Sequence, residues 1–323
     1  MSEASASSSP AVDVTSAPLP WDVLVVGGLN TDFVGKGAGL PRAGETLNGD
    51  TFHQTAGGKG ANQAVAVARL GGRVALVGAV GSDGRGEELK ARLRGEGVDV
   101  SFVRTIEGVP TGAALIHVDG SGEKQILSVP GANCRPTPFD VTGSCEALGS
   151  PRVLLTQFEL PIESVVAALR WARAGGTRTV LDPAPAVQVS DEVLALVDFL
   201  KPNSREAEVL TGVQVRDRAS ATRAARDLIA RGVGTVAIQA ADEGNLLVWN
   251  TGEYFLKRLP VESVDATGAG DAFAGALAIQ IARGRSLEDA ARHANAAAAH
   301  ATTVLGAQEG LPTEDEIRAL LSR

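Results

Sequence analysis

The chain has 323 residues, of which 44% are hydrophobic and 21% charged, so it can bury a sizeable core as one large α/β domain or two smaller ones. Its net charge of -8 is spread over mixed acidic and basic residues, which argues against nucleic acid or an acidic membrane surface as a partner. Cys134 and Cys145 are too few for a disulfide framework, and no segment approaches the roughly 18 apolar residues of a membrane span. A reducing, cytoplasmic setting is therefore expected.

The first ordered element is expected after a polar leader. Residues 1–20 are rich in Ser, Ala and Pro and are predicted to be disordered, ahead of an ordered domain at 21–323. The apolar run Asp22 to Gly28 ends in glycines, which predicts a buried strand. Asn30 and Asp32 follow it, at the point where a parallel strand opens onto a binding crevice.

A lid or small subdomain is predicted from two segments, Val34 to Thr55 and a hairpin at 113–129. The first segment is rich in glycine and poorly periodic. The second has hairpin character, with candidate strands at 113–118 and 125–129 around the turn residues Asp119 to Gly122. The hairpin is expected to complete the lid.

Between these segments a glycine-rich stretch, Gly57-Gly58-Lys59-Gly60-Ala61-Asn62, leads into an apolar helix at 65–70. Its glycines permit close approach of the backbone to a ligand. Lys59 and Asn62 lie one helical turn apart, so they can face the same ligand. The alternative interpretation is a helix start with a solvated lysine.

Farther along, strands alternate with helices. Strands are expected at 74–80, 153–159, 179–181, 198–201 and 236–239, and helices at 87–94, 162–174, 220–231, 288–303 and 314–321. This alternation predicts an α/β fold with three layers, in which a doubly wound, mostly parallel sheet has helices on both faces.

Polar residues follow several of these strands, at the edge where open parallel sheets bind ligands. Carboxylate, ammonium and amide groups on Asn30, Asp32, Lys59 and Asn62 can hydrogen-bond the several hydroxyls of a sugar. Glu159 lies at a strand end and can join them, although a solvated carboxylate is an equal alternative.

Asn203 and Glu206 form a second candidate group. Their spacing is typical of a capping box at a helix start. A carboxylate and an amide at this edge also suit magnesium and phosphate groups, directly or through water. The two interpretations are compatible.

The segment from Val264 to Gly275 carries the clearest chemical signal. Gly268 and Gly270 allow several backbone N–H groups to point at one spot, and the following helix adds the positive end of its dipole. Asp271 falls in the first turn, where it stays ionised and can accept a proton from a hydroxyl. An anion hole beside a base suits phosphoryl transfer to an alcohol, whereas the simpler alternative is a glycine-rich connection.

Two other phosphate motifs are missing from the sequence. No Gly-x-x-x-x-Gly-Lys-Ser/Thr run occurs, because Lys59 is followed by Gly60. Gly27-Gly28 lacks the third glycine of the dinucleotide fingerprint. A P-loop enzyme is therefore excluded, and a nicotinamide enzyme is disfavoured.

Together these motifs resemble those of the ribokinase, or PfkB, family of carbohydrate kinases, from about Trp21 to the C-terminus. Gly57 to Asn62 looks like the first family signature, and Asp265 to Asp271 looks like the second. Lys201-Pro202-Asn203 through Glu206 is similar to the family's Asn-x-x-Glu segment, and Leu305-Gly306-Ala307-Gln308 resembles the C-terminal loop of ribokinases in particular.

The resemblance implies ATP-dependent phosphorylation of the 5-hydroxyl of D-ribose, with Asp271 as the base and Gly268, Ala269 and Gly270 as the anion hole. It implies a sugar site of Asn30, Asp32, Gly58, Lys59, Asn62, Glu159 and Asp271, and an ATP site of Asn203, Gln239, Gly244, Gly270 and Asn295. Glu206 would organise Mg²⁺ through water, and a monovalent cation, expected to be K⁺, would lie at Asp265, Thr267, Ala301, Val304, Gly306 and Gly310. The resemblance also implies a small β-sheet lid over the sugar, at about 31–55 and 110–129, and a homodimer that pairs through this lid.

One segment departs from the family pattern. Gln239-Ala240-Ala241-Asp242-Glu243-Gly244 stands where most members have Thr-Leu-Gly, so Ala241 adds a methyl group at a place of close backbone approach. Two alternatives to a ribose kinase stay open: a kinase of another sugar or of a nucleoside, and a sugar-binding protein without efficient phosphotransfer.

Overall fold

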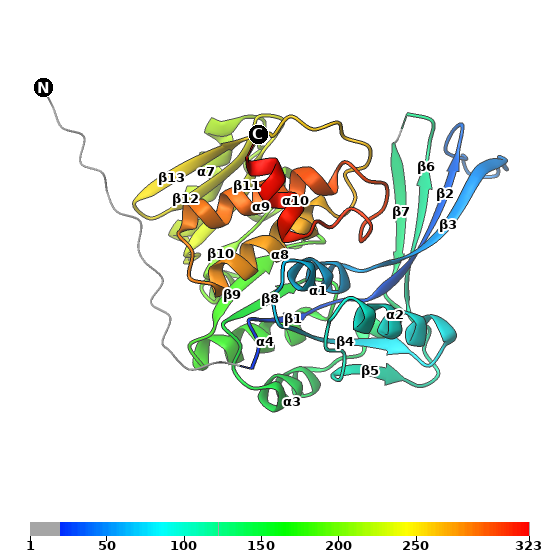
Figure 1. Ribbon diagram of the computed structural model, residues 1–323, viewed down its shortest axis with the longest axis horizontal. Helices are drawn as coiled ribbons and strands as arrows, with labels where there is room; N and C mark the ends of the chain where they lie inside the picture. Colours follow the sequence, from blue (N-terminus) through cyan, green and yellow to red (C-terminus); the bar gives the residue numbers. More distant parts are fainter. Residues whose placement is uncertain (1–19, 122, 323) are drawn as a thin grey trace, which may run out of the picture.

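The computed structural model describes residues 20–121 and 123–322, so the predicted leader lies outside the described residues apart from Pro20. The central sheet has the strand order β13-β12-β11-β10-β9-β8-β1-β4-β5 (Figure 1). Its strands are β1 (Val23–Val26), β4 (Val74–Gly81), β5 (Val103–Ile106), β8 (Val153–Gln157), β9 (Arg178–Asp182), β10 (Phe199–Leu200), β11 (Thr235–Ala240), β12 (Gly244–Trp249) and β13 (Gly252–Lys257).

The middle of this sheet is parallel and buried. All residues of β1 and β4 are buried, because apolar residues on both faces of a strand suit a sheet that is covered on both sides. β1 pairs in parallel with β4 and with β8. At the other edge β11, β12 and β13 run antiparallel, so the hairpin at 244–257 adds two strands that the sequence pattern did not indicate.

Helices cover both faces of the sheet, which confirms the predicted layers (Figure 1). Val23 and Val25 pack toward α1 (Lys59–Arg69), α2 (Gly84–Gly95), α8 (Ala269–Ala282), α9 (Leu287–Ala301) and α10 (Glu314–Leu321). Leu24 and Val26 pack toward α3 (Pro138–Leu148), α4 (Ile162–Ala174), α5 (Asp191–Leu194), α6 (Ser204–Thr211) and α7 (Arg218–Ala230). Successive strand residues point to opposite faces, so a continuous apolar run supplies both cores. Among the described residues, no helix combines the length and hydropathy that crossing a membrane requires.

A small separate sheet stands beside this body (Figure 1). Its order is β3-β2-β6-β7, with β2 (Asn30–Gly37), β3 (Gly49–Gly57), β6 (Gly112–Val118) and β7 (Lys124–Val129). β6 and β7 form the expected antiparallel hairpin, and β2 joins β6 in parallel. Between the two pairs of strands the chain passes through α1, which begins at Lys59 instead of the predicted residue 65.

The two faces of this small sheet differ in character. Residues that are paired across strands share a face, so Phe33, Leu115 and Leu127 form one row. Phe52 lies on the same face, where its ring stacks on Phe33 with centroids 6.3 Å apart. Phe52, Leu115 and Leu127 are exposed there. Asp32 belongs to the opposite face, because successive strand residues alternate.

Candidate active site

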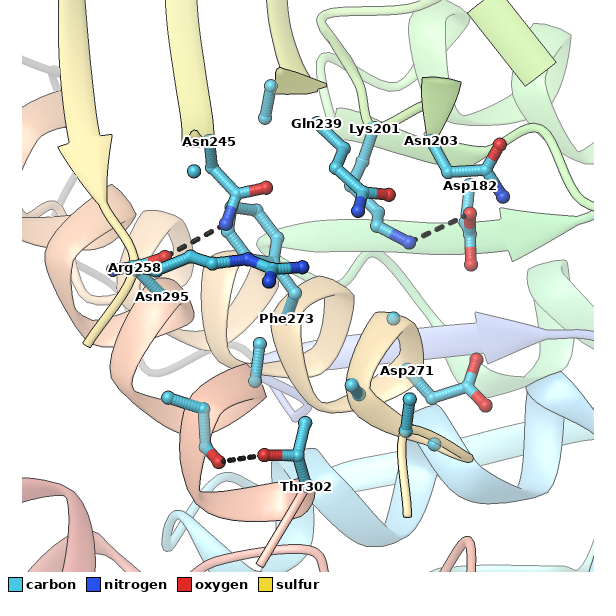
Figure 2. A pocket seen from close by; sticks show the side chains of 18 of the residues that line it. Asp182, Lys201, Asn203, Gln239, Asn245, Arg258, Asp271, Phe273, Asn295 and Thr302 are labelled. Atoms are coloured by element: carbon cyan, nitrogen blue, oxygen red, sulfur yellow. Dashed lines mark hydrogen bonds and ion pairs between the residues drawn. The ribbon is translucent and has the colours of Figure 1, made fainter. Parts of the chain in front are cut away.

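A pocket of about 540 Å³ lies at the carboxyl ends of the central strands, bounded by the starts of α6 and α8 (Figure 2). It contains residues from both candidate groups and from the Gly268 turn. The sequence-predicted residues that line it are Lys59, Asn203, Glu206, Gln239, Gly244, Gly268, Ala269, Gly270, Asp271 and Asn295. Residues that lie far apart in the sequence therefore meet at one edge of the sheet.

The turn before α8 requires glycine. Gly268 has φ 80°, and a Cβ there would lie 2.6 Å from the carbonyl oxygen of Ala307, so no other residue fits without a shift. Among the described residues, no side chain caps this helix, and its first residues, Ala269, Gly270 and Asp271, line the pocket. Asp271 follows in the first turn and is 5% exposed. An uncapped helix start beside a carboxylate can stabilise an anion and accept a proton.

Amide groups hold both oxygens of the Asp271 carboxylate. Asn62 Nδ2 donates to Oδ2 at 2.9 Å, and Gln63 Nε2 donates to Oδ1 at 3.0 Å. Gln63 also donates to Asp182 at 2.9 Å and accepts from Gln157 at 2.5 Å. Sequence reasoning did not identify Gln63 or Gln157. The position of Gln63 next to Asn62 in the glycine-rich stretch was the one available signal.

The predicted sugar-binding residues surround this carboxylate on the side of the small sheet. Lys59 donates its backbone N–H to Glu159 Oε2 at 2.7 Å, and Glu159 follows β8, which ends two residues earlier. Asn30 Oδ1 accepts from Asn133 Nδ2 at 2.8 Å, which fixes its amide. Asn133 is a further residue that sequence reasoning missed. Gly58 lies before the first residue of α1, with φ 88°.

Burial and neighbouring charges shift the pKa values of this group. Burial, together with the charges of Asp271 and Glu309, raises the pKa of Asp32 to about 6. Burial also raises the pKa of Glu159 to about 7, although the ammonium of Lys59 opposes the shift. The charge of Asp271 raises the pKa of Lys59 above its usual range despite burial. Lys59 therefore stays charged beside carboxyl groups that titrate near neutrality.

On the other side of Asp271, several residues form a pocket wall suited to a nucleotide. Asn203 and Glu206 form the expected capping box, in which each side chain binds the other residue's backbone N–H. Asn295 is held by Asn245 at 2.8 Å and donates to the Lys257 carbonyl at 3.0 Å (Figure 2). Its amide therefore fixes the β12–β13 hairpin at the pocket.

The Gln239 to Gly244 segment lines the same wall. Ala241 has φ 47°, a left-handed conformation that favours glycine. A Cβ on Gly244 would lie 2.1 Å from the Leu256 carbonyl oxygen, so this second glycine cannot be replaced in place. The methyl group of Ala241 therefore sits on a backbone conformation that suits glycine better than alanine.

The loops predicted to hold a monovalent cation also meet. Asp265 Oδ2 accepts from the Gly306 N–H at 3.1 Å, and Thr267 donates to Asp265 Oδ1 at 2.7 Å. A Cβ on Gly310 would lie 2.5 Å from the Ala301 carbonyl oxygen, so these two residues are adjacent, whereas Val304 is partly exposed. The Asp265 carboxylate thus lies at the loop that contains Gly306, and a carboxylate is a ligand type that fits a hard cation.

Lys124 of β7 reaches this loop from the small sheet. Its ammonium lies 2.5 Å from Asp265 Oδ1 and also donates to Thr267. Burial raises the pKa of Asp265, but the hydrogen bonds from Lys124 and Thr267 outweigh it and lower the pKa to about 2. The carboxylate thus attracts positive charge strongly.

Few acidic side chains are available to bind Mg²⁺ directly in the described part of the chain. Within residues 20–121 and 123–322, no cluster of three or more His, Cys, Asp and Glu side chains is arranged to enclose a metal ion. Burial and the charge of Asp182 raise the pKa of Glu206, whose oxygens accept from Asn203. Glu206 and Asn203 fit a Mg²⁺ ion that is coordinated mainly by phosphate oxygens and water, with the Glu206 carboxylate binding one of those waters.

Comparison with known proteins accounts for this combination of fold and pocket. A model of the pfkB family of carbohydrate kinases matches residues 21–314. The chain is 38% identical to a ribokinase of Haemophilus influenzae over 292 residues, which cover 90% of this chain and 95% of that protein. It is 32% identical to a deoxyribokinase of Salmonella typhi over 302 residues, with coverage of 93% and 99%.

A solved structure of Arabidopsis thaliana ribokinase complexed with ribose and ATP superimposes with a TM-score of 0.84 at 29% identity. The match covers 93% of this chain and 98% of that chain. The protein is therefore a carbohydrate kinase, a phosphotransferase that uses ATP to phosphorylate a sugar. Within this class, the chain belongs to the pfkB family and is of the ribokinase type.

Proposed function

We propose that this kinase transfers the γ-phosphoryl group of ATP to the 5-hydroxyl of D-ribose, giving D-ribose 5-phosphate and ADP. The observation that carries the proposal is the position of Asp271, between the sugar-binding group and the nucleotide wall and next to the uncapped turn at Gly268. A base at this junction can contact an acceptor hydroxyl on one side and face a phosphate on the other.

In the proposed reaction, Asp271 accepts the proton of the sugar hydroxyl while the oxygen of that hydroxyl bonds to the γ-phosphorus. The bond between that phosphorus and the bridging oxygen of ADP breaks. The turn Gly268, Ala269 and Gly270 stabilises the negative charge of the transferring group through backbone N–H groups. The sugar is oriented by Asn30, Asp32, Gly58, Lys59, Asn62 and Glu159. The nucleotide site is lined by Asn203, Gln239, Gly244 and Asn295.

Cations have defined places in this proposal. Glu206 would hold Mg²⁺ through water, and the bound ion would neutralise phosphate charge. The loops at Asp265, Thr267, Ala301, Val304, Gly306 and Gly310 would hold K⁺ close to the turn. The small sheet acts as a lid over the sugar, because the face that carries Asp32 belongs to the sugar site. A cytoplasmic location stays a prediction.

A second acceptor is also supported. The similarity to a deoxyribokinase, at 32% identity, favours a kinase that accepts 2-deoxyribose, which differs from ribose by one hydroxyl. Hydroxyl-binding sites can discriminate strongly against an analogue that lacks the group, so the two sugars are distinguishable by kcat/KM.

The decisive test is a coupled assay for ADP release with ATP, Mg²⁺ and D-ribose, with and without K⁺. Ribose-dependent turnover that rises with K⁺ is expected. 2-Deoxyribose, other pentoses and nucleosides form the comparison panel. A higher kcat/KM for one of these would change the substrate and leave the mechanism intact, whereas sugar binding without any ADP release would indicate a binding protein.

A further inference from the structure

Lys201 brings a positive charge to the turn that precedes α8. A Cβ added to Gly270 would lie 2.8 Å from Lys201 Nζ, so the missing side chain of Gly270 leaves room for this ammonium. Lys201 lines the same pocket as Gly268, Asp271 and Asn203 (Figure 2). Its side chain is 13% exposed. The ammonium therefore lies beside the turn, where a phosphoryl group bound at Gly270 would be close to it.

Contacts hold both the backbone and the side-chain ammonium of Lys201. Its backbone N–H donates to the Leu181 carbonyl at 2.9 Å, directly after β10, and Pro202 follows. Its ammonium contacts Asp182 Oδ1 at 3.3 Å, and Asp182 is 1% exposed (Figure 2). Asp182 Oδ2 accepts from Gln63, and the same amide group donates to Asp271. One buried glutamine therefore links the partner of the lysine to the proposed base.

The hydrogen-bonding capacity of Lys201 is not exhausted by this pair. In the described part of the chain, its ammonium has one hydrogen-bond acceptor, Asp182. An ammonium carries three N–H donors, so two are available to a ligand in the pocket. The surroundings are acidic, with Asp182, Glu206 and Asp271 in the same pocket. A ligand phosphate that enters this region needs positive charge, which Lys201 and Lys59 supply.

We propose that Lys201 is a catalytic residue of the phosphotransfer, whose ammonium donates hydrogen bonds to oxygens of the transferring phosphoryl group at Gly270. This inference rests on the proposed function for the nature of the reaction. The lysine stays protonated throughout: the hydroxyl proton goes to Asp271, and the electron pair of the broken P–O bond goes to ADP. Asp182 and Gln63 act as positioning residues: Asp182 holds the ammonium of Lys201, and Gln63 connects Asp182 to the base Asp271.

The first test compares Lys201→Met with the parent in the ADP-release assay. Loss of one fixed cation at a transferring phosphoryl group is expected to lower kcat about 10²- to 10³-fold, with a small change in the KM for the sugar. Lys257→Met is the matched control. Lys257 is exposed at the end of β13, next to the pocket residue Arg258, and its replacement also removes one positive charge. Parent-like kcat in Lys201→Met would overturn the proposal.

A double variant separates catalysis from charge balance. Lys201→Met alone leaves the buried carboxylate of Asp182 without its positively charged partner, which can also destabilise the protein. Asp182→Asn combined with Lys201→Met removes both charges and is expected to regain thermal stability. Its kcat is expected to stay low. Recovery of parent turnover in the double variant would show that the lysine only neutralises Asp182.

A binding measurement tests Lys201 without any acceptor sugar. Calorimetry of the full chain with Mg²⁺ and a non-hydrolysable ATP analogue is expected to show affinity about 10-fold weaker in Lys201→Met, whereas ADP affinity changes by less than about 2-fold. Equal losses for both nucleotides would overturn a contact with the γ-phosphoryl group. If the parent turned over no ribose, the proposed substrate would fail while this comparison still tested Lys201.

Discussion

Asp271 has both carboxylate oxygens tied to amide groups, from Asn62 and Gln63. A carboxylate held in this way keeps one orientation toward the acceptor hydroxyl. Asp271→Ala removes the proton acceptor and is expected to lower kcat about 10³-fold or more, while sugar affinity measured by calorimetry stays within about 3-fold of the parent. Asp271→Asn, which conserves the shape, serves as the control for local packing. Retained turnover in both variants would exclude Asp271 as the base.

The raised pKa values of Asp32 and Glu159 predict that sugar binding depends on pH. Their pKa values of about 6 and about 7 mean that both carboxyl groups become ionised acceptors only as the pH approaches and passes neutrality. Ribose affinity is therefore expected to rise between about pH 5 and about pH 8, as followed by calorimetry. In Glu159→Gln the affinity is lower and the step near neutral pH disappears. A parent affinity that is flat over this range contradicts these ionisations.

The same shifts set the sign of the effect on stability. A carboxyl group whose pKa is higher in the folded state than in the unfolded chain binds protons more tightly when folded. It therefore adds stability in acid, and this contribution is lost as the pH rises through the folded pKa of about 7 for Glu159. In the absence of sugar, Glu159→Gln is expected to lose less stability than the parent over that rise, as measured by thermal unfolding.

Ala241 gives a direct test of the departure from the family pattern. Its φ of 47° is unfavourable for a residue with a Cβ. Ala241→Gly is expected to leave the free energy of unfolding unchanged or raise it by up to about 1 kcal/mol, and to lower the KM for ATP. Ala240→Gly is the control, because Ala240 lies buried in β11 and the change there is expected to destabilise the protein by about 1 kcal/mol.

At the scale of elements, β7 is tied to the loop before α8 by one lysine. Lys124 contacts Asp265, which is 8% exposed at its side chain, and this contact joins the small sheet to the loop before α8. Thr55 of β3 makes a second link, to Glu309 at 3.0 Å. A sheet that is joined to the body by these contacts can close over a bound sugar.

Removing the first link tests this closure. Lys124→Met is expected to raise the KM for the sugar about 5-fold, which corresponds to about 1 kcal/mol for a partly buried ion pair. Lys36→Met, at an exposed position of β2 in the same sheet, is the matched control and is expected to keep the parent KM. Equal KM values in the parent and Lys124→Met would show that the contact does not contribute to closure.

At the scale of the whole molecule, the apolar face of the small sheet predicts association. Phe52, Leu115 and Leu127 are 66%, 44% and 62% exposed, an unusual cluster for a surface that stays in water. A second copy that covers this face would form the homodimer that the family resemblance implies. Leu127→Glu places a charge on this face, at the edge strand β7, and is expected to give monomers in light scattering. Glu123→Lys, directly before the first residue of β7, serves as the control. A monomeric parent would contradict the dimer.

The sequence by itself determined the features that depend on neighbouring residues. The alternation of apolar runs with amphipathic segments indicated strands and helices in their order, and α4 and α10 have the predicted bounds. Backbone requirements are equally local: the glycines around Gly268 and the spacing of Asn203 and Glu206 indicated a turn and a helix cap before any fold was known. The central β-sheet and its helical layers follow from these patterns.

Only the tertiary structure decided which distant side chains share one hydrogen bond or one cavity. Gln63 and Asp271 lie 208 residues apart, and no periodic pattern links them. The contact of Lys201 with Asp182 and its closeness to Gly270 depend on the order β10-β9 in the sheet and on where α8 begins. The antiparallel hairpin β12–β13 likewise depends on pairing at a free sheet edge. Strand order and side-chain packing are properties of the whole chain, so local sequence patterns do not contain them.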